Sequence, residues 1–472
     1  MQRFESSAFQ AHISCPRTDA QLVRHGAVLT VNLSYQGAYG MGEKYDALNQ
    51  KGRVVVNQVE EKFCFQGEKT YCPTPFFWTD SGFGLYVDTC ETTTFHLDEN
   101  SVTIDLPESA PVVAFSGEPA QIVSAYMELF GKAVLPPEWA FGVWVSANRR
   151  NCQKDAEQQI ENLKKHDFPA SILVLEAWSD EATFYIWNGA KYQPNPDGAA
   201  LQYDDFDFSG SPWPDPKDMV DALHKAGLHL VLWQIPVYKK QGPDEILNVQ
   251  NTLDREDAVR RGLCVHLADG TPYTIPDGHW FSGSMIPDYT NPETVQTWFA
   301  KRQYLLDMGV DGFKTDGGEF IYRPDVRFMD GSDGKSGKNR YARDYTCAYR
   351  DFIGSQRVLF SRAGFSGQHT VPMHWGGDQQ SQNAELRSQL HAGLSAAASG
   401  ILFWGFDIAG FAGPLPTLDL YRRATQMACF CPIMQWHSEP DGGQFKELMP
   451  GGEGNNERSP WNLAAAYNAP EF

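Results

Sequence analysis

Eight short apolar runs, alternating with helix-like stretches, fill the second part of the chain and constrain its fold more than any other feature. Runs of this length with helical segments between them are typical of buried strands in parallel βαβ units. Eight such strands are the number in a (β/α)8 barrel, an α/β fold, so we predict that fold here. The runs are FGVWVS (141–146), SILVLE (171–176), LHLVLWQ (228–234), GFKTD (312–316), VLFSR (358–362), VPMHW (371–375), ILFWGFD (401–407) and PIMQWH (432–437).

Several of the intervening segments carry helix signals. Residues 153–166 have apolar residues at helical spacing, and residues 215–227 begin after prolines and end on glycine. Residues 291–309 begin with Asn291 as a cap and a proline at the first helical position, and we predict one helix there. The polar, glycine-rich residues 331–338 predict a flexible loop after the fourth strand.

The part of the chain before about residue 130 is rich in strand signals. Alternating or β-branched runs are separated by turn residues, a pattern that predicts an antiparallel β-sandwich. The prolines within residues 135–137 mark a boundary, so we predict a sandwich domain over residues 1–134 and a barrel domain over residues 135–472. The runs lie at 27–35, 53–59, 83–89, 92–98, 101–106 and 111–117.

Each of the eight barrel runs ends on, or next to, a polar residue. In a (β/α)8 barrel the functional site lies at the carboxyl ends of the strands. A single polar residue at the end of a strand can simply be a loop residue exposed to water. Polar residues at all eight strand ends favour a shared polar pocket. The strand ends are Ser146, Glu176, Gln234, Asp316, Arg362, Trp375 to Asp378, Asp407 and His437.

Composition limits the partners of the chain. It has 39 lysines and arginines against 59 aspartates and glutamates, a net charge of −20, which disfavours nucleic acid and anionic membranes. No window approaches 18 uninterrupted apolar residues, so we expect no membrane span. The nine cysteines are odd in number and form no CxxC pair, and the first residues lack the features of a signal peptide. We therefore expect a reduced, cytoplasmic location.

The chemistry at the strand ends is dominated by carboxylates. The sequence contains no HExxH metal motif, no GxGxxG opening a helix after a strand, no P-loop and no GxSxG elbow, so we expect neither a metal ion nor an organic cofactor. A pair of carboxylates suits glycoside hydrolysis, in which one group attacks and the other donates and then recovers a proton. The two must lie in different environments, so that one is ionised and the other protonated.

Six segments between about residues 38 and 461 resemble the motifs of one family, glycoside hydrolase family 31, which contains α-glucosidases and α-xylosidases. This resemblance implies the sandwich and barrel architecture and a retaining α-glycosidase. The segments are AYGMGEKYDALNQKG (38–52), CPTPFFWTDSGFGLYVDT (72–89), LPPEWAFGVWVS (135–146), SGSMIPDYTNPET (282–294), DGFKTDGGE (311–319) and SRAGFSGQHTVPMHWGGD (361–378).

The last two motifs imply the catalytic pair. DGFKTDGGE is similar to the family's nucleophile motif and implies that Asp316 is the nucleophile. SRAGFSGQHTVPMHWGGD is similar to its acid/base motif and implies that Asp378 is the general acid/base. The fourth and sixth strands of a barrel can face each other across its mouth, so this placement is compatible with a carboxyl separation of roughly 5 Å, the retaining geometry.

The resemblance also implies the residues that would bind the sugar. Arg362 matches the arginine on the nucleophile side, and His437 matches a histidine that contacts sugar hydroxyls. Glu176 occupies the place of a common aspartate, Lys314 points into the same lumen as Asp316, and Asp407 matches a polar residue after the seventh strand or caps the next helix.

For two tryptophans and one glutamate, the sequence is compatible with both a role in the sugar site and a structural role. Trp375 and Trp233 are candidate stacking or wall residues of the sugar site, and Trp233 suits the barrel core equally well. Glu43 suits a structural role, although some family members use its loop to reach the site.

The resemblance has two departures. Glu176 is one methylene longer than the usual aspartate, which leaves open whether the sugar is glucose, xylose, galactose or N-acetylgalactosamine. The chain stops at Phe472, where family members continue into C-terminal β-domains, so we expect those domains to be missing. The predicted activity is exo-acting hydrolysis of an α-linked sugar from an oligosaccharide or glycoconjugate, through a covalent β-glycosyl-enzyme intermediate. We favour an α-glucosidase or α-xylosidase over an α-galactosidase or N-acetyl-α-galactosaminidase. Transglycosylation, lyase elimination and non-catalytic sugar binding are the alternatives.

Overall fold

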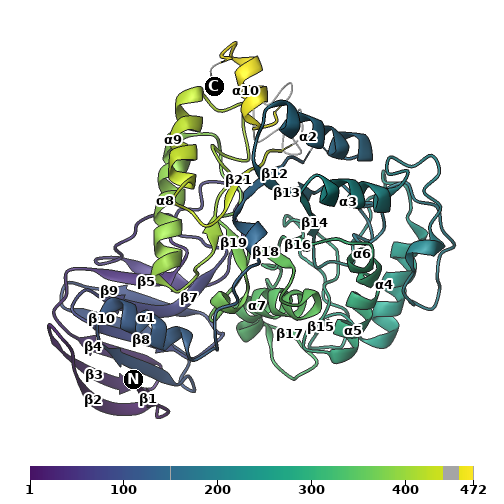
Figure 1. The fold of residues 1–472 in the computed structure, drawn as a ribbon. Helices are drawn as coiled ribbons and strands as arrows, with labels where there is room; N and C mark the ends of the chain where they lie inside the picture. The colour runs from purple at the N-terminus through teal and green to yellow at the C-terminus, as the bar shows by residue number, and fades with distance from the viewer. Residues whose placement is uncertain (149, 440–455, 471–472) are drawn as a thin grey trace.

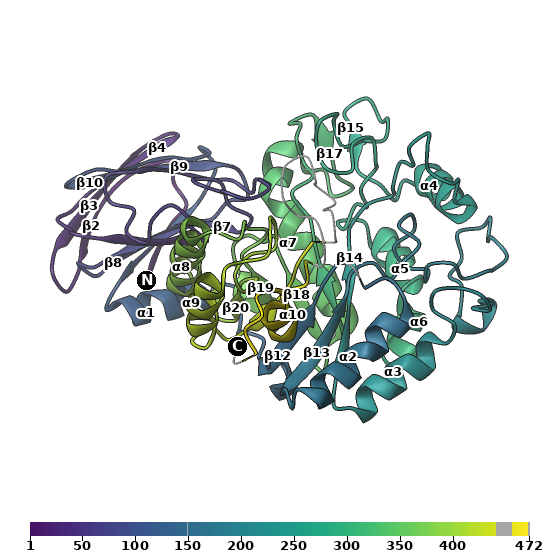
Figure 2. The ribbon, with the colours of Figure 1, turned by 90° about the horizontal axis from the view of Figure 1, so that it is seen from above.

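The computed structural model describes residues 1–148, 150–439 and 456–470. Two antiparallel sheets at the N-terminal end (purple to blue) lie beside a parallel barrel (teal to yellow) (Figure 1). The view from above shows the two parts side by side (Figure 2). No helix within the described residues is long and apolar enough to span a membrane.

The N-terminal sheets pack face to face, as the sequence predicted. Apolar residues of both sheets, such as Leu22, Val31, Phe77 and Leu85, form one core between them. The five-stranded sheet has the order β1 (Gln2–Phe4), β11 (Val112–Ser116), β8 (Phe83–Val87), β7 (Pro73–Thr79), β5 (Ala38–Gly42). The six-stranded sheet has the order β2 (Ala8–Ser14), β3 (Asp19–His25), β4 (Val28–Asn32), β10 (Ser101–Asp105), β9 (Thr93–Leu97), β6 (Val54–Asn57).

The eight apolar runs of the second part all form parallel strands of one sheet, which confirms the predicted barrel. The strand order follows the chain, and the first strand pairs with the last, with Val145 opposite Trp436. Asp407 and Gln435 form the bridge that closes the ring on the remaining side. The strands are β12 (Val143–Ser146), β13 (Ala170–Leu175), β14 (His229–Gln234), β16 (Gly312–Thr315), β18 (Val358–Ser361), β19 (Met373–Trp375), β20 (Trp404–Gly405) and β21 (Met434–Trp436).

Helices cover the outside of this barrel. The predicted helices over 153–166 and 215–227 are confirmed as α2 and α3, and the side chain of Asn291 caps α5 by accepting from the backbone of Glu293 at 2.9 Å. The helices of the barrel part are α2 (Gln153–Lys165), α3 (Pro216–Lys225), α4 (Val249–Arg261), α5 (Pro292–Ala300), α6 (Gln303–Asp307), α7 (Gly334–Ile353), α8 (Asn383–Ala398), α9 (Leu418–Ala428) and α10 (Pro460–Ala466). Helix α1 (Pro119–Met127) instead packs against β7, β8 and β11 of the N-terminal part. A separate two-stranded antiparallel sheet pairs β15 (His266–Leu267) with β17 (Val326–Arg327).

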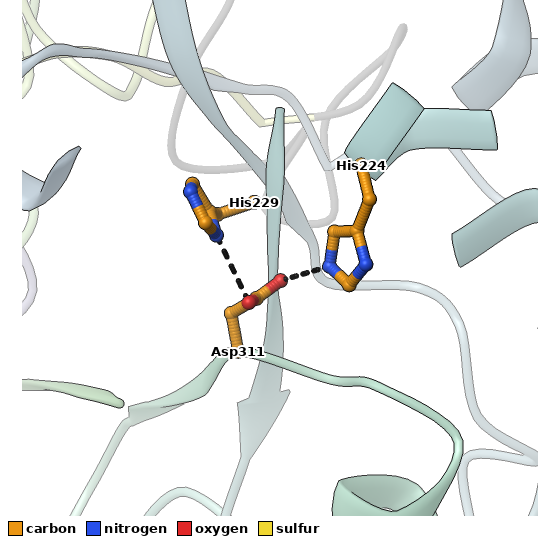
Figure 3. Close-up of side chains that lie close together, drawn as sticks. All are labelled: His224, His229 and Asp311. Atoms are coloured by element: carbon orange, nitrogen blue, oxygen red, sulfur yellow. Dashed lines mark hydrogen bonds and ion pairs between the residues drawn. The ribbon is translucent and has the colours of Figure 1, made fainter. Parts of the chain in front are cut away.

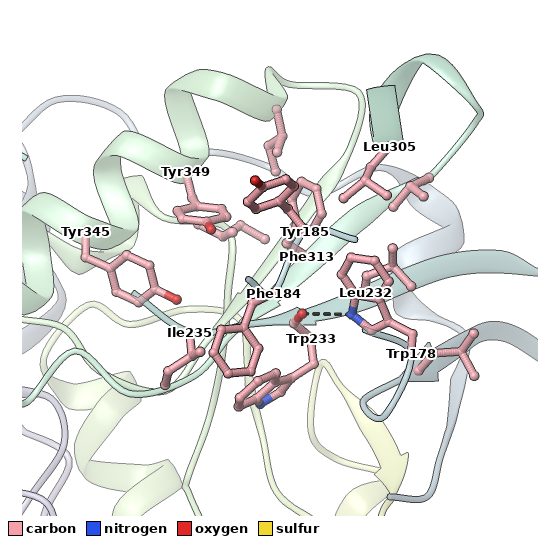
Figure 4. Packing of buried hydrophobic residues seen from close by; sticks show 14 of the residues in the cluster. Trp178, Phe184, Tyr185, Leu232, Trp233, Ile235, Leu305, Phe313, Tyr345 and Tyr349 are labelled. Carbon is pink, nitrogen blue, oxygen red and sulfur yellow. Dashed lines mark hydrogen bonds between the residues drawn. The ribbon is translucent and has the colours of Figure 1, made fainter. Parts of the chain in front are cut away.

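A large aromatic core joins the helices to the strands. Tyr345 and Tyr349 of α7 point toward the barrel, where Phe313 and Leu232 lie on neighbouring strands (Figure 4). Burial of such side chains stabilises a fold by about 1.5–3 kcal/mol each, so this layer fixes the strand ends that carry the polar residues.

The single helix predicted over 291–309 is broken into α5 and α6. Lys301 and Arg302 lie at the break and are both buried. The ammonium of Lys301 donates to Asp254 at 2.6 Å, and the guanidinium of Arg302 donates to Gln234 at 2.5 Å. These two buried polar contacts are made where α5 ends, at Lys301, and where α6 is capped, at Arg302.

The predicted loop over 331–338 is wrong in its second half, which begins α7. Asp333 caps the helix by accepting from the backbone of Lys335 and Ser336. A Cβ on Gly334 would lie 1.9 Å from the carbonyl oxygen of Arg323, so this glycine permits close packing.

The two parts of the chain are joined by buried contacts. Helix α8 packs against β5, and the backbone of Gly42 donates to the hydroxyl of Ser399 at 2.8 Å. The side chain of Asn339 on α7 accepts from the backbone of Val59 at 2.7 Å. All nine cysteines lie in the described residues, and none forms a disulfide.

Candidate active site

A cavity of about 700 Å³ opens at the carboxyl ends of the barrel strands. This volume lies within the range of about 300–1,000 Å³ that is usual for small-molecule sites. Seven of the nine sequence-predicted site residues line it, together with residues of the long loops. The lining residues are Glu61, Phe63, Asn148, Glu176, Ala177, Glu181, Trp233, Gly278, His279, Trp280, Phe281, Lys314, Asp316, Arg362, Asp378, Phe411 and His437.

Asp316 follows β16 directly and is held by three donors. Its backbone continues the ladder by donating to the carbonyl of Gln234 at 2.9 Å. Its carboxylate accepts from the indole N–H of Trp233 at 3.0 Å and from the backbone N–H of Gly317 at 2.8 Å. The guanidinium of Arg362 lies 3.1 Å from the same carboxylate. These contacts fix the carboxylate as an acceptor with one face toward the cavity.

Asp378 follows β19 after two glycines. A Cβ on Gly377 would lie 2.2 Å from the ring of Tyr71, and its φ of +70° also favours glycine. Burial raises the pKa of Asp378 well above its usual value, the carboxylate of Asp316 raises it further, and Arg362 opposes both effects. The raised pKa favours the protonated form of Asp378.

Arg362 joins the two carboxylates. One of its terminal nitrogens lies 3.1 Å from Oδ1 of Asp316 and 3.8 Å from Oδ2 of Asp378. These two oxygens are therefore at most about 7 Å apart, the sum of the two distances, whereas retaining glycosidases hold their carboxyl groups about 5–5.5 Å apart and inverting ones about 6.5–9.5 Å. A separation of at most about 7 Å is compatible with the carboxyl spacing of retaining glycosidases, and it excludes most of the spacings found in inverting ones.

Glu176, Lys314 and His437 form a charged network at the buried end of the cavity. The Lys314 ammonium donates to Glu176, and Nε2 of His437 lies 3.1 Å from the same carboxylate oxygen. Burial alone would raise the pKa of Glu176, but His437 and Lys314 lower it to about 2. Nδ1 of His437 is hydrogen-bonded to the Ser146 hydroxyl at 2.7 Å, so the ring is held from both sides. Glu176 and Lys314 therefore form an ion pair that hydrogen bonds hold in place.

The other predicted site residues lie behind this network. Trp375 is 1% exposed in the apolar core of the barrel, with the Lys314 ammonium 4.6 Å from its ring centre. Asp407 is buried, its Oδ1 accepts from Gln435 at 2.6 Å, and its Oδ2 has no hydrogen-bond partner among the described residues. Burial raises the pKa of Asp407, although His437 and Lys314 lower it in part. Both residues therefore act on the pocket through the side chains in front of them.

Glu43 is placed away from the cavity. Its carboxylate accepts from the indole of Trp404 at 2.8 Å and from the hydroxyl of Tyr45 at 3.1 Å. Burial raises its pKa to about 8. This is the structural role that the sequence suggested for it.

Glu319 and Tyr71 support Arg362 and were not singled out from the sequence. Nε and Nη2 of Arg362 each donate to a carboxylate oxygen of Glu319 at 3.1 Å, and the guanidinium lies 4.6 Å from the ring centre of Tyr71. Glu319 closes the DGFKTDGGE motif, so its position three residues after Asp316 was the available signal.

The loop between β6 and β7 brings the N-terminal part into the site. It contributes Glu61 and Phe63 to the cavity wall. Burial raises the pKa of Glu61, and Arg362 opposes this. This contribution could not be predicted from the sequence, because it depends on how the two parts pack.

Aromatic rings form part of the cavity wall. Trp280 and Phe281 lie on the loop before α5, with ring centres 5.0 Å apart, and the Arg362 guanidinium lies 5.4 Å from the Trp280 ring. Phe411 stacks on His437 at 4.9 Å. Such faces suit the apolar C–H faces of sugar rings.

Within the described residues, one group of side chains is spaced closely enough to bind a metal ion, namely His224, His229 and Asp311. These residues lie at the amino ends of β14 and β16, whereas the cavity lies at the carboxyl ends.

The fold and the cavity together define a (β/α)8-barrel protein with the paired-carboxylate arrangement of glycoside hydrolases. Residues 133–468 match the glycosyl hydrolases family 31 TIM-barrel domain, and residues 26–96 match the glycosyl hydrolase 31 N-terminal galactose mutarotase-like domain. The chain belongs to glycoside hydrolase family 31, as its motifs indicated.

Three relatives illustrate this membership. The chain is 38% identical to an isomaltosyltransferase of Sporosarcina globispora and 38% identical to a 1,3-alpha-isomaltosidase of Kribbella flavida, in each case over 90% of this chain. It spans 39% and 59% of the lengths of those two relatives. The solved structure of a cycloalternan-degrading enzyme from Trueperella pyogenes in complex with isomaltose superposes with a TM-score of 0.88 at 34% identity, covering 97% of this chain and 68% of that one.

Proposed function

We propose that this protein is a retaining, exo-acting α-glucoside hydrolase with transferase capacity, acting through Asp316 and Asp378. The observation that carries the proposal is the sharing of one Arg362 nitrogen by the two carboxylates at the carboxyl end of the barrel. It supports a single reacting centre between the two carboxylates.

In the first step Asp316 attacks the anomeric carbon of the α-linked sugar, while Asp378 gives its proton to the leaving oxygen. The bond from Asp316 to carbon forms as the glycosidic bond breaks, and the product is a β-glycosyl ester. The donors on Asp316, from Trp233 and Gly317, orient the attacking oxygen. The raised pKa of Asp378 supports its role as the acid.

In the second step Asp378 takes a proton from water or from a sugar hydroxyl, which attacks the ester carbon and releases Asp316. Two inversions leave the product with the α configuration. Arg362 keeps a positive charge beside both carboxylates through both steps, and Glu319 holds it in place.

The charged network of Glu176, Lys314 and His437 is the proposed glycone site. All three side chains are buried at the inner end of the cavity, which supports recognition of a chain end rather than an internal residue. Their donors and acceptors suit a sugar with several free hydroxyls, because an unmatched buried polar group is costly. We therefore favour a hexose over xylose.

Glucose is the favoured hexose because both relatives reported above are named for isomaltosyl or isomaltosidase activity. Release of a disaccharide needs a second sugar position, and the cavity of about 700 Å³ with its partly aromatic wall has room for one. Transfer to a sugar acceptor is the second candidate outcome, favoured by Trp280, Phe281 and Phe411 at that wall.

The test compares the purified chain on 4-nitrophenyl α-glucoside and α-isomaltoside with the matching α-xyloside, α-galactoside and N-acetyl-α-galactosaminide. We expect turnover of a glucosyl substrate and an α-configured first product by NMR. Asp316→Asn and Asp378→Asn should each lose more than about a thousandfold of it, whereas Asp419→Asn, at an exposed site on α9, should lose none.

The products separate the alternatives. Longer oligosaccharides on addition of isomaltose indicate transfer, and an unsaturated sugar indicates lyase elimination. Binding without release of any sugar would make the chain a binding protein. A β-configured first product would contradict the retaining mechanism.

A further inference from the structure

Two histidines and an aspartate from three separate segments meet at the other end of the barrel (Figure 3). His224 is in the last turn of α3, His229 is the first residue of β14, and Asp311 directly precedes β16. Nε2 of His224 lies 2.8 Å from Oδ2 of Asp311, and Nδ1 of His229 lies 2.9 Å from Oδ1. The potential ligand atoms of the three all lie within 4.8 Å of one another.

This cluster is separate from the proposed catalytic pocket. It lies at the amino ends of the strands, where residues of (β/α)8 barrels serve stability rather than catalysis. The side chains are 36%, 29% and 17% exposed for His224, His229 and Asp311, so an ion can reach them from solvent. Nothing in the proposed glycosidase chemistry uses these groups.

We propose that His224, His229 and Asp311 form a binding site for a divalent transition-metal ion of the zinc type, which ties α3 to the barrel floor. Imidazole nitrogens and a carboxylate oxygen are ligands that Zn²⁺ accepts, with bonds of about 2.0–2.2 Å, and water completes a four-coordinate shell. The two imidazoles and the carboxylate already converge on one side, so the ion replaces the two protons that now lie between them.

The distances require only a small adjustment. Neighbouring ligand atoms around a tetrahedral Zn²⁺ lie roughly 3.3 Å apart. The two present nitrogen–oxygen contacts, at 2.8 and 2.9 Å, must each open by about half an ångström, and the imidazoles must draw together. Rotation about side-chain bonds suffices for shifts of this size, because none of the three side chains is completely buried.

The surroundings of the cluster already orient the ligands. The backbone N–H of Leu230 donates to Oδ2 of Asp311 at 2.8 Å, and Trp139 stacks on the ring of His229 at 3.9 Å. Contacts of this kind, which fix ligands from behind, typically strengthen metal binding about 10–100-fold. The carboxyl end of α3 also presents its negative dipole end to the cation.

The test is a titration of the purified chain with Zn²⁺ alone, after removal of metals by a chelator and exchange into chelator-free buffer at about pH 7.5, where free imidazole is mostly neutral. Wild-type protein, His224→Gln and His229→Gln are compared by calorimetry. The control is His25→Gln, at an exposed histidine that ends β3. Zinc bound elsewhere, for example by the free cysteines, contributes equally to all four proteins.

We expect the wild type and His25→Gln to bind one equivalent more than either cluster variant, or to bind that equivalent at least about tenfold more tightly. Equal stoichiometry and affinity in all four proteins would overturn the proposal. X-ray absorption of the zinc-loaded wild type gives the answer if a variant does not fold. Imidazole and oxygen ligands in the zinc spectrum support the site, whether or not a sulfur-bound equivalent is also present, and a zinc shell without imidazole would overturn the proposal.

Discussion

The replacement Glu319→Gln tests how Arg362 is held beside the two carboxylates. Glu319 is buried, and its two oxygens accept from Nε and Nη2 of Arg362 at 3.1 Å each. Glutamine keeps one acceptor and presents an NH2 donor where the second oxygen was. That donor then faces an arginine N–H, so one bond is lost and a repulsive contact replaces it.

The structure sets the size of the effect. A hydrogen bond to a charged group contributes about 1.5–3 kcal/mol, and Arg362 keeps Asp316 as a second counter-charge. We expect Glu319→Gln to lower the free energy of unfolding by about 2–3 kcal/mol. We also expect kcat/KM to fall about ten- to a hundredfold, because small displacements of a positioned group have effects of that order.

The assay is urea unfolding at equilibrium together with steady-state kinetics on the best substrate. The matched control is Glu293→Gln, since Glu293 also pairs with an arginine, Arg261, at 2.7 Å, but is half exposed. An exposed pair contributes about 0–1 kcal/mol, so this variant should lose little stability and no activity. If Glu319→Gln were no less stable and no less active than Glu293→Gln, the reasoning about Arg362 would be refuted.

Three further predictions follow from single contacts. Trp233→Phe keeps the ring but removes the indole donor to Asp316, and should lower kcat about tenfold without changing the unfolding midpoint. Gly334→Ala places a Cβ 1.9 Å from the carbonyl oxygen of Arg323, and should reduce stability by about 1–3 kcal/mol in urea unfolding. In the presence of a chelator, the two histidines and a backbone N–H outweigh the effect of burial and lower the pKa of Asp311 from 3.8 to about 2. The ionised Asp311 carboxylate therefore adds about 2 kcal/mol to the free energy of unfolding above about pH 4, and this contribution is lost as the pH falls toward 2. The free energy of unfolding of Asp311→Asn should therefore differ most from that of the wild type at neutral pH.

The strand framework could be predicted from the sequence because each barrel strand is a continuous apolar run. The runs that became β13 and β14 are buried along almost their whole length, so periodicity and length were sufficient signals. The residues directly after these strands were then placed at one end of the barrel by topology alone. Glu176 and His437, more than 200 residues apart in sequence, meet for that reason.

What the sequence could not give depends on packing between segments. The reach of Glu61 and Phe63 into the cavity requires the docking of the N-terminal sheets against the barrel. The glycines of residues 331–338 indicated flexibility, whereas Gly334 and Gly337 permit close contacts with backbone and with Phe328. A single sequence does not distinguish a glycine that close packing requires from a glycine in a flexible loop.

The most direct test of the proposed chemistry is to trap the covalent intermediate with a 5-fluoro α-glucosyl fluoride and to locate the label by mass spectrometry of peptides. The account predicts a glycosyl ester on Asp316, formed in the wild type and absent from Asp316→Asn. A label on Asp378, or steady turnover of the reagent by a protein in which Asp316 has been replaced, would contradict it.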